Sequence, residues 1–255
     1  WNQTGEYFPS LTGAPSTQYY LDCEKSLFRE FCLQLRGKKV FKSDLWDEAK
    51  NTRILHWISQ QGASVFALDI STPMVKQARS LFEGDGHPHF IIGDLRNIAF
   101  GPASFDVIYS MGTIEHFHDY RQSIQECYRI LRPGGLILMG VPNRWDPFLR
   151  PLMVCALRAC RLYSYGYERS FSRRALRREL TDAGFEPVGE SGVLFMPGLL
   201  RMLDLFLHVH WRWATQLTTP LIRPFAWMYR NHPAVRRHSY LLCIAARKPP
   251  HPNGG

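Results

Sequence analysis

The sequence lacks the signatures of several common protein classes. None of its six cysteines belongs to a Cys-x-x-Cys pair, and no cysteine–histidine cluster has the spacing of a zinc site. The cysteines are therefore predicted to be free thiols, which favours a reducing compartment, and no metal is expected. Neither a Gly-x-Gly-x-x-Gly fingerprint nor a Walker loop occurs, which disfavours dehydrogenases and nucleoside triphosphatases.

Long apolar runs are absent from the sequence as well. A membrane-spanning helix needs about 18 consecutive apolar residues with few charges, and no stretch of the chain meets that condition. The N-terminus lacks the basic, apolar and small-residue order of a signal peptide. With a hydrophobic fraction of 45% and a charged fraction of 21%, the chain is expected to be a globular cytoplasmic protein.

Acidic residues are scarce in the second half of the chain. Residues 128–255 contain 18 arginines and one lysine against 7 aspartates and glutamates, whereas residues 1–127 contain 12 basic and 15 acidic residues. A surplus of one sign in one half of a chain indicates an anionic partner. An anionic membrane surface is the favoured partner of this kind, and a nucleic acid is the less favoured one.

Apolar runs alternate with helical patterns along the chain, and this alternation predicts a parallel sheet with crossover helices. Strands are predicted at 38–43, 64–69, 89–93, 105–110, 135–142, 185–191 and 239–247. Helices are predicted at 17–35, 51–61, 72–82, 120–132 and 172–183.

Polar residues stand at the ends of three predicted strands. Asp69, Asp94 and the stretch Ser110-Met111-Gly112 each follow an apolar run, and ligands of doubly wound sheets bind beyond the carboxyl ends of the strands. A carboxylate at the end of the second strand is suited to accept hydrogen bonds from both ribose hydroxyls of a nucleotide. We therefore expect a nucleotide-like ligand at this edge of the sheet.

The order and spacing of these motifs resemble the class I S-adenosylmethionine-dependent methyltransferases, in particular the small-molecule branch that includes the enzymes of ubiquinone biosynthesis. The resemblance implies an α/β fold with a doubly wound, mostly parallel sheet of seven strands, the last of which is antiparallel. It also implies S-adenosyl-L-methionine as the cofactor. The segments that carry it are 67–71, 92–95, 105–116, 131–135, 141–143, 170–172 and 180–185.

The resemblance also implies roles for individual residues. Asp69 would bind the ribose hydroxyls, Asp94 would contact the adenine amino group, and Leu95 would lie beside the ring. The methionine end of the cofactor would be lined by the residues that follow the fourth strand. The cofactor-binding residues implied in this way are Asp69, Ile70, Asp94, Leu95, Ser110, Met111 and Gly112.

Glu115 and His116 begin the segment that faces the acceptor in this family, and they are the predicted catalytic residues. His116 would act as a general base for a hydroxyl acceptor, because the pKa of imidazole lies near neutrality. It remains open whether His116 only packs or caps its loop. Tyr19 and Tyr20 of the first helix, together with Asn143 after the fifth strand, are predicted to contact the substrate.

The first loop departs from the family pattern. Family members have an acidic residue at the end of strand one and then Gly-x-Gly-x-Gly, whereas this chain has Lys42 near the acidic position and no glycine from Lys38 to Leu55. Glycine lets the backbone approach a ligand closely, so the cofactor needs another means of support. Asp44 or Glu48 is predicted to pair with its amino group. Alternatively, the loop fills the pocket and the protein is a catalytically silent binding or scaffold module.

An insertion rich in arginine and aromatic residues is predicted between strands six and seven. From 199 to 214, Arg201, Asp204, His208 and Arg212 recur every three or four residues and form a narrow polar face on an otherwise apolar helix. Three interpretations remain open. The insertion is a buried lid with an arginine-rich solvent face, a membrane-peripheral subdomain, or an RNA-binding surface.

These observations predict a methyltransferase that acts on the oxygen or carbon of a hydrophobic small molecule or lipid, with an RNA methyltransferase as a further alternative. Four regions are expected along the chain. They are an N-terminal helical cap (1–36), the methyltransferase core (37–191 and 239–248), the helical insertion (192–238) and a disordered tail (249–255).

Overall fold

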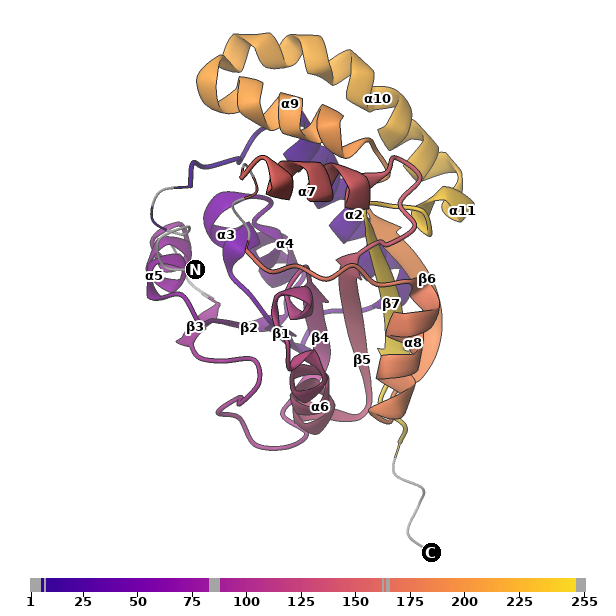
Figure 1. The fold of residues 1–255 in the computed structure, drawn as a ribbon. Coiled ribbons are helices and arrows are strands. Elements are labelled where there is room, and N and C mark those ends of the chain that lie inside the picture. The colour runs from indigo at the N-terminus through magenta and orange to yellow at the C-terminus, as the bar shows by residue number, and fades with distance from the viewer. Residues whose placement is uncertain (1–5, 7, 83–87, 162, 164–165, 251–255) are drawn as a thin grey trace, which may run out of the picture.

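One seven-stranded sheet organises the residues that the computed structural model describes, which are 6, 8–82, 88–161, 163 and 166–250. Its strand order is β3-β2-β1-β4-β5-β7-β6, with β7 antiparallel to both of its neighbours (Figure 1). The predicted doubly wound, mostly parallel sheet is therefore confirmed. The strands are β1 (Lys39–Lys42), β2 (Ser64–Asp69), β3 (His89–Ile92), β4 (Phe105–Met111), β5 (Leu131–Pro142), β6 (Glu186–Val193) and β7 (Leu241–Arg247).

Helices cover both faces of the sheet. Alternate residues of β5 show why: Leu136 and Leu138 join a core with α2, α4 and α5, whereas Ile137 and Met139 join a second core with α6 and α8. A strand whose side chains are apolar on both faces must be covered on both sides. The helices named here are α2 (Pro15–Phe31), α4 (Ile54–Gln60), α5 (Thr72–Ser80), α6 (Tyr120–Ile130) and α8 (Arg173–Asp182).

The strand order reverses between β1 and β4, which lie side by side although β2 and β3 separate them in sequence. At such a switch point, the loops after the two strands diverge and leave room for a ligand. The loop after β1 departs from the prediction. The helix expected at 51–61 is the shorter α4, and an additional short helix, α3 (Trp46–Lys50), precedes it; Arg53 lies between the two in a left-handed conformation with φ of 57°.

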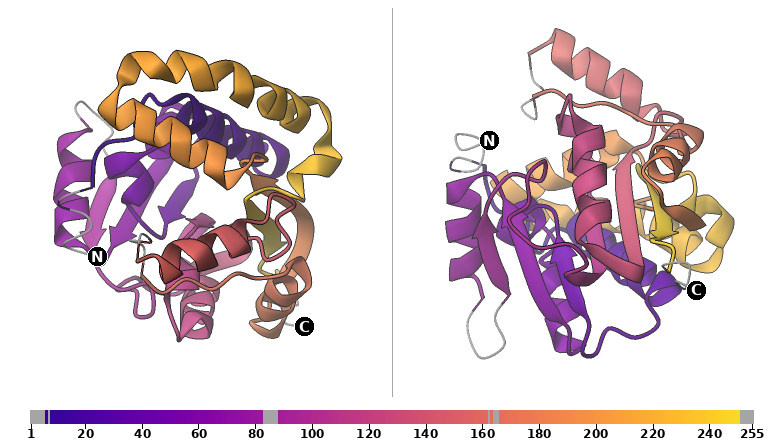
Figure 2. Two further views of the ribbon diagram at one scale, coloured as in Figure 1. Left: turned by 45° about the horizontal axis from the view of Figure 1, so that its top comes forward. Right: turned by 90° about the horizontal axis from the view of Figure 1, so that it is seen from below.

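The remaining helices form a layer beyond the C-terminal edge of the sheet (Figures 1 and 2). The predicted insertion between β6 and β7 is present, and it packs on α2.

No helix within the described residues has the length and apolar character needed to cross a bilayer. The domain boundaries stay a prediction, and residues 251–255 of the expected tail lie outside the described part of the chain. The helices of this layer are α7 (Arg150–Ala159), α9 (Gly198–His210), α10 (Thr215–Asn231) and α11 (Pro233–Arg236), with a 3-10 turn, η2 (Arg212–Ala214), between α9 and α10.

Asp204 joins three helices of this layer. Its carboxylate is fully buried, accepts the backbone N–H of Ser16 at 2.8 Å in the first turn of α2, and accepts the hydroxyl of Thr218 on α10. The first N–H groups of a helix have no partner within the helix, and α2 has no side-chain cap of its own. Asp204 therefore supplies the missing acceptor from a distant part of the sequence.

We expect Asp204→Ala to lower the free energy of unfolding by about 3 kcal/mol, because a buried N–H and a buried hydroxyl lose their charged acceptor. Asp204→Asn keeps one acceptor oxygen and is expected to cost about half as much. Urea unfolding followed by circular dichroism measures both, with the exposed Gln216→Ala on α10 as the control. A loss of less than about 0.5 kcal/mol for Asp204→Ala, as is usual for surface changes, would contradict this role.

Candidate functional site

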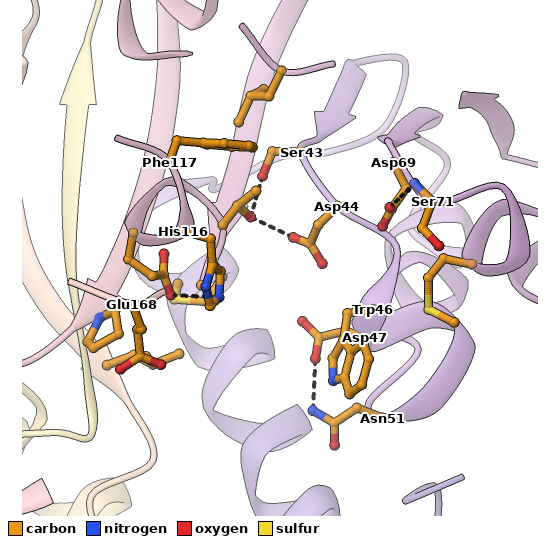
Figure 3. Close-up of a pocket in the computed structure, with 18 of the residues that line it drawn as sticks. Ser43, Asp44, Trp46, Asp47, Asn51, Asp69, Ser71, His116, Phe117 and Glu168 are labelled. Atoms are coloured by element: carbon orange, nitrogen blue, oxygen red, sulfur yellow. Dashed lines mark hydrogen bonds and ion pairs between the residues drawn. The ribbon is translucent and has the colours of Figure 1, made fainter. Parts of the chain in front are cut away.

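A pocket opens at the C-terminal edge of the sheet, beyond β1, β2 and β4. In Figure 3, Asp69 and His116 lie on opposite sides of it, and Asp44 and Trp46 lie between them. Arg201 of α9 contributes to the wall from the layer of helices above the sheet. The glycine-free loop therefore borders the pocket but leaves it open.

Asp69 closes β2 and is held by two backbone groups. The N–H of Ser71 donates to its Oδ1 and the N–H of Leu45 donates to its Oδ2, both at 2.8 Å. Each carboxylate oxygen can accept a further hydrogen bond, so Asp69 still has room for two hydroxyl donors. Burial raises the pKa of Asp69 to about 6. The buried Ser71 hydroxyl beside it has no hydrogen-bond partner among the described residues.

Lys42 is the centre of a buried charge cluster at the end of β1. Its Nζ donates to the backbone oxygen of Asp44 at 3.1 Å and to Oδ1 of the same residue at 3.0 Å. It also lies 3.7 Å from Oδ2 of Asp47 and 3.9 Å from Oε1 of Glu48. Lys42 and Glu48 are completely buried, so the lysine is stabilised by the acidic residues of α3 and the preceding loop instead of by water.

The groups in this cluster shift one another's pKa values. Burial opposes the charge on Lys42, but the carboxylates of Asp44, Asp47 and Glu48 outweigh it and raise the pKa of the lysine. Burial raises the pKa of Glu48 to about 8, against the attraction of Lys42, so this carboxyl is largely protonated at neutral pH. The end of β1 and the first loop thus bring one lysine and three acidic side chains together at this side of the pocket.

Two hydrogen-bonded pairs orient the carboxylates of the loop. The hydroxyl of Thr113, after β4, donates to Oδ2 of Asp44 at 2.9 Å. The amide of Asn51 donates to Oδ1 of Asp47 at 2.8 Å, and its own oxygen accepts the hydroxyl of Thr17 at 2.9 Å. The loop is thus attached to the neighbouring strand on one side and to α2 on the other.

His116 lies on the side of the pocket opposite Asp69 (Figure 3), in the 3-10 turn η1 (Ile114–His116). Its Nδ1 is 2.7 Å from the backbone oxygen of Tyr167, and because a carbonyl only accepts, Nδ1 carries the hydrogen and Nε2 the lone pair. Burial lowers the pKa of His116. Burial and the nearby Glu168 raise the pKa of Glu115 well above its usual value. The imidazole of His116 is therefore neutral near pH 7.

An ion pair forms part of the pocket wall near His116. The guanidinium of Arg150 on α7 donates to both carboxylate oxygens of Glu168, at 2.8 and 2.9 Å, and lies 4.3 Å from the centre of the Tyr240 ring. The hydroxyl of Tyr163 donates to the same carboxylate. Because these charges are paired with each other, the wall presents mainly rings and apolar groups to the pocket. The other apolar residues on this side are Phe117, Pro142 and Leu241.

The opposite end of the pocket is an apolar slot. Leu68 and Leu95 are buried there, and the absence of a side chain at Gly93 makes room for Leu68, since a Cβ would lie 2.9 Å from its Cδ1. Gly112 has a φ of 75°, a conformation that glycine adopts without strain. This end of the pocket is therefore lined mainly by apolar side chains.

The structure brings most of the predicted site residues into one pocket, although their individual roles stay predictions. Those from the cofactor set lie toward β2 and the first loop, and the predicted catalytic pair lies toward α7. The predicted residues that line the pocket are Tyr20, Asp44, Asp69, Ile70, Leu95, Met111, Gly112, Glu115 and His116.

Five predicted site residues lie outside the lining. Glu48 accepts a backbone N–H at the start of α4, and Asp94 forms a two-pronged ion pair with the arginine two residues further along. The hydroxyl of Tyr19 donates to two backbone carbonyls of the insertion, and Asn143 bonds to backbone groups of neighbouring loops. The side chain of Ser110 is buried within β4. In the structure, these side chains support the elements around the site.

Sequence reasoning missed several residues of the pocket wall. Trp46 lines it from the start of α3, Arg150 from α7 and Arg201 from α9. Glu168 has no motif of its own and is recognisable only through its pairing with Arg150. The Leu-Trp pair beside Asp44 was the one local signal for Trp46.

We expect Lys42→Met to lower the free energy of unfolding by about 3 kcal/mol or more, because it leaves buried carboxylates without their cation. The loss is expected to be greater at alkaline than at acidic pH, since protonation relieves the repulsion among the acids. Chemical denaturation at several pH values measures this. Lys39→Met, at an exposed position of the same strand, is the matched control, and equal stabilities of the two variants would disprove the role of Lys42.

Comparison with known proteins agrees with this geometry. A family model described as a methyltransferase domain matches residues 34–139. A probable S-adenosylmethionine-dependent methyltransferase of Mycolicibacterium smegmatis is 30% identical over 205 residues, which cover 78% of this chain and 71% of that protein. The malonyl-[acyl-carrier protein] O-methyltransferase of Salmonella typhimurium is 32% identical over 85 residues, so this chain spans only a third of that relative.

The fold also matches that of solved structures. An S-adenosylmethionine-dependent methyltransferase from Mesorhizobium loti superposes with a TM-score of 0.60 at 16% identity, over 89% of this chain and 99% of that one. Similarity at this low identity shows only the fold. The family follows from the mycobacterial relative, because the match at 30% identity covers most of both chains. The chain therefore belongs to the S-adenosylmethionine-dependent methyltransferases, with S-adenosylmethionine as its cofactor.

Proposed function

We propose that the protein transfers the methyl group of S-adenosylmethionine to a hydroxyl oxygen of a hydrophobic small molecule or lipid. The observation that carries the proposal is the course of the pocket, which runs from Asp69 past Asp44 to His116 and ends among aromatic and apolar side chains. A cofactor site and an apolar acceptor site with a neutral imidazole thus share one cavity.

The residues at the β2 end fit the nucleoside part of the cofactor. Asp69 has acceptor capacity left for the two ribose hydroxyls, and the Ser71 hydroxyl beside it has no partner among the described residues. The slot formed by Leu68, Ile70 and Leu95 suits the faces of adenine.

The first loop fits the methionine part. The carboxylates of Asp44 and Asp47 suit its amino group, and Arg201 in the same wall suits its carboxylate. Side-chain charges here replace the backbone contacts that a glycine-rich loop supplies.

When bound, S-adenosylmethionine supplies an electrophilic methyl group to a nucleophile aligned with its sulfonium. His116 is suited to take the proton of an acceptor hydroxyl at Nε2, because Nδ1 is committed to the backbone oxygen of Tyr167. Its lowered pKa keeps it neutral and ready to act as a base at pH 7. Oε1 of Glu115 lies 4.0 Å from Nε2 of His116, and burial raises the pKa of this carboxyl, which opposes a negative charge beside the imidazole.

The proposal is tested by incubating the protein with methyl-tritiated S-adenosylmethionine and separate acceptors: an alkylphenol, a prenylated phenol, a fatty acid and total RNA. Label is expected in the phenolic lipids after organic extraction. Label in RNA alone would overturn the acceptor class. No label in any of these acceptors, from protein that binds S-adenosylhomocysteine, would overturn it as well.

We expect His116→Gln to lower kcat for a hydroxyl acceptor about 100-fold or more, the usual contribution of a general base. The rate of the variant is expected to recover as the pH approaches the pKa of the acceptor, because the acceptor then ionises without help. Initial rates across pH test this, and His118→Gln, two residues away and exposed, is the matched control. A variant that keeps the wild-type rate and pH profile would show that His116 is not the base.

We expect the affinity for S-adenosylhomocysteine to weaken below the Asp69 pKa of about 6. Protonation removes acceptor capacity for the ribose hydroxyls, so the dissociation constant should rise about tenfold at one pH unit below that pKa. Isothermal titration across pH measures this. Asp69→Asn should bind more weakly and lose the pH step, and an unchanged step in that variant would assign the titration to another group.

A further inference from the structure

Helix α9 is oriented with its polar face inward. The polar stripe formed by Arg201, Asp204 and His208 faces the rest of the protein, and Asp204 and His208 are 0% and 7% exposed. Asp204 binds α2 and α10, and the guanidinium of Arg201 lies 5.1 Å from the centre of the Tyr20 ring. A surface helix normally has the opposite orientation.

The outward face of α9 is consequently apolar. Its exposed side chains recur at helical spacing, and Leu199 and Phe206 are 66% and 50% exposed. Two helices that contact α9 also carry exposed leucines, Leu149 and Leu152 at α7 and Leu217 and Leu221 on α10. More than half of the exposed large apolar side chains of the described chain lie between residues 199 and 227. These are Leu199, Met202, Leu203, Phe206, Val209, Trp211, Trp213, Leu217, Leu221 and Trp227.

The charge of this segment has one sign at its surface. Residues 192–238, all of which the structure describes, contain six arginines and a single acidic residue, the buried Asp204. Arg212, Arg223 and Arg230 are exposed. The outer surface of the insertion therefore combines apolar side chains and arginines with no exposed carboxylate.

We propose that this surface, which we call the α9 face, docks on an anionic phospholipid bilayer. Tryptophan and leucine side chains enter the boundary between headgroups and acyl chains, and arginines bind the lipid phosphates. Trp211, Trp213 and Trp227 are more than half exposed, and tryptophan favours that boundary because its ring is both apolar and a hydrogen-bond donor. The protein then lies on the bilayer without spanning it.

The sign of the charge favours a bilayer over a second copy of the chain. A two-fold symmetric contact places the same patch against itself, which would bring arginines of both copies together with no exposed carboxylate of the insertion to separate them. A bilayer with anionic headgroups offers the complementary charge and the apolar depth together. The positive charge and the apolar side chains of the α9 face thus both suit an anionic bilayer.

Docking in this orientation also has a consequence for the pocket. Arg201 of α9 and Arg150 of α7 line the cavity from the same helices that carry the exposed leucines. These helices lie above the C-terminal edge of the sheet in Figure 1. The bilayer would therefore contact the layer that roofs the pocket, although the docking itself does not depend on which acceptor is methylated.

Flotation with vesicles tests the proposal, using phosphatidylcholine alone and phosphatidylcholine mixed with phosphatidylglycerol. The protein is expected to float with the anionic vesicles at low salt and much less at high salt. The double variant Leu203→Ser/Phe206→Ser is expected to reduce the partition coefficient at least about tenfold. Each of Arg212→Gln, Arg223→Gln and Arg230→Gln is expected to reduce it about fivefold. Leu33→Ser, at a position 93% exposed outside the α9 face, is the matched control and should float like the wild type.

Three results would overturn the proposal. One is the absence of flotation at low salt from protein that melts cooperatively. Another is a dimer in sedimentation velocity that Leu203→Ser/Phe206→Ser converts to a monomer, with no vesicle binding, which would assign the face to a second copy. The third is salt-sensitive binding of RNA without binding of vesicles. Binding of S-adenosylhomocysteine, measured on the same samples, separates these outcomes from a failure of the proposed methyl transfer.

Discussion

The attraction between the buried ammonium of Lys42 and the surrounding carboxylates is the interaction on which the site depends. A lysine with no exposed surface at the end of a central strand needs compensating charge within about 4 Å, and the loop and helix that follow provide it. To bring Asp44, Asp47 and Glu48 to one point, the chain turns tightly into α3. The course of the first loop thus follows from the position of one cation.

This arrangement explains how the loop can do without glycine. A glycine-rich loop recognises a ligand through backbone groups, which requires the chain to pass close to the ligand. In the proposed mode of binding, the carboxylates of Asp44 and Asp47 take the place of those backbone groups. Thr113 and Asn51 fix the direction of Asp44 and Asp47, and Lys42 limits their mutual repulsion. Recognition by oriented side chains needs such a supporting network, whereas recognition by backbone does not.

Much of the fold was predictable because apolar runs alternate with helical patterns along the chain and polar residues stand at the ends of three of the predicted strands. Asp69 illustrates this, since its place after β2 was enough to bring it to the switch point. Asp94 occupied an equivalent place after β3, but its carboxylate binds Arg96, a competition between neighbours that strand spacing does not reveal. Glu48 was recognisable as part of the unusual loop, yet its partner at the start of α4 depended on the break at Arg53, which no residue preference in that stretch announced.

Helix α9 shows a different limit of sequence reasoning. A polar stripe every three or four residues predicts an amphipathic helix but does not say which face is buried, because a polar stripe can be buried when each group has a partner. Other segments supply the partners of Asp204. They are the N–H of Ser16, which has no partner within α2, and the hydroxyl of Thr218 on α10. Satisfying them turns Asp204 inward and therefore turns Leu203 and Phe206 outward. The apolar surface above the pocket is thus a direct consequence of capping α2, and the contacts that hold the roof of the pocket in place also expose the side chains available to bind lipid.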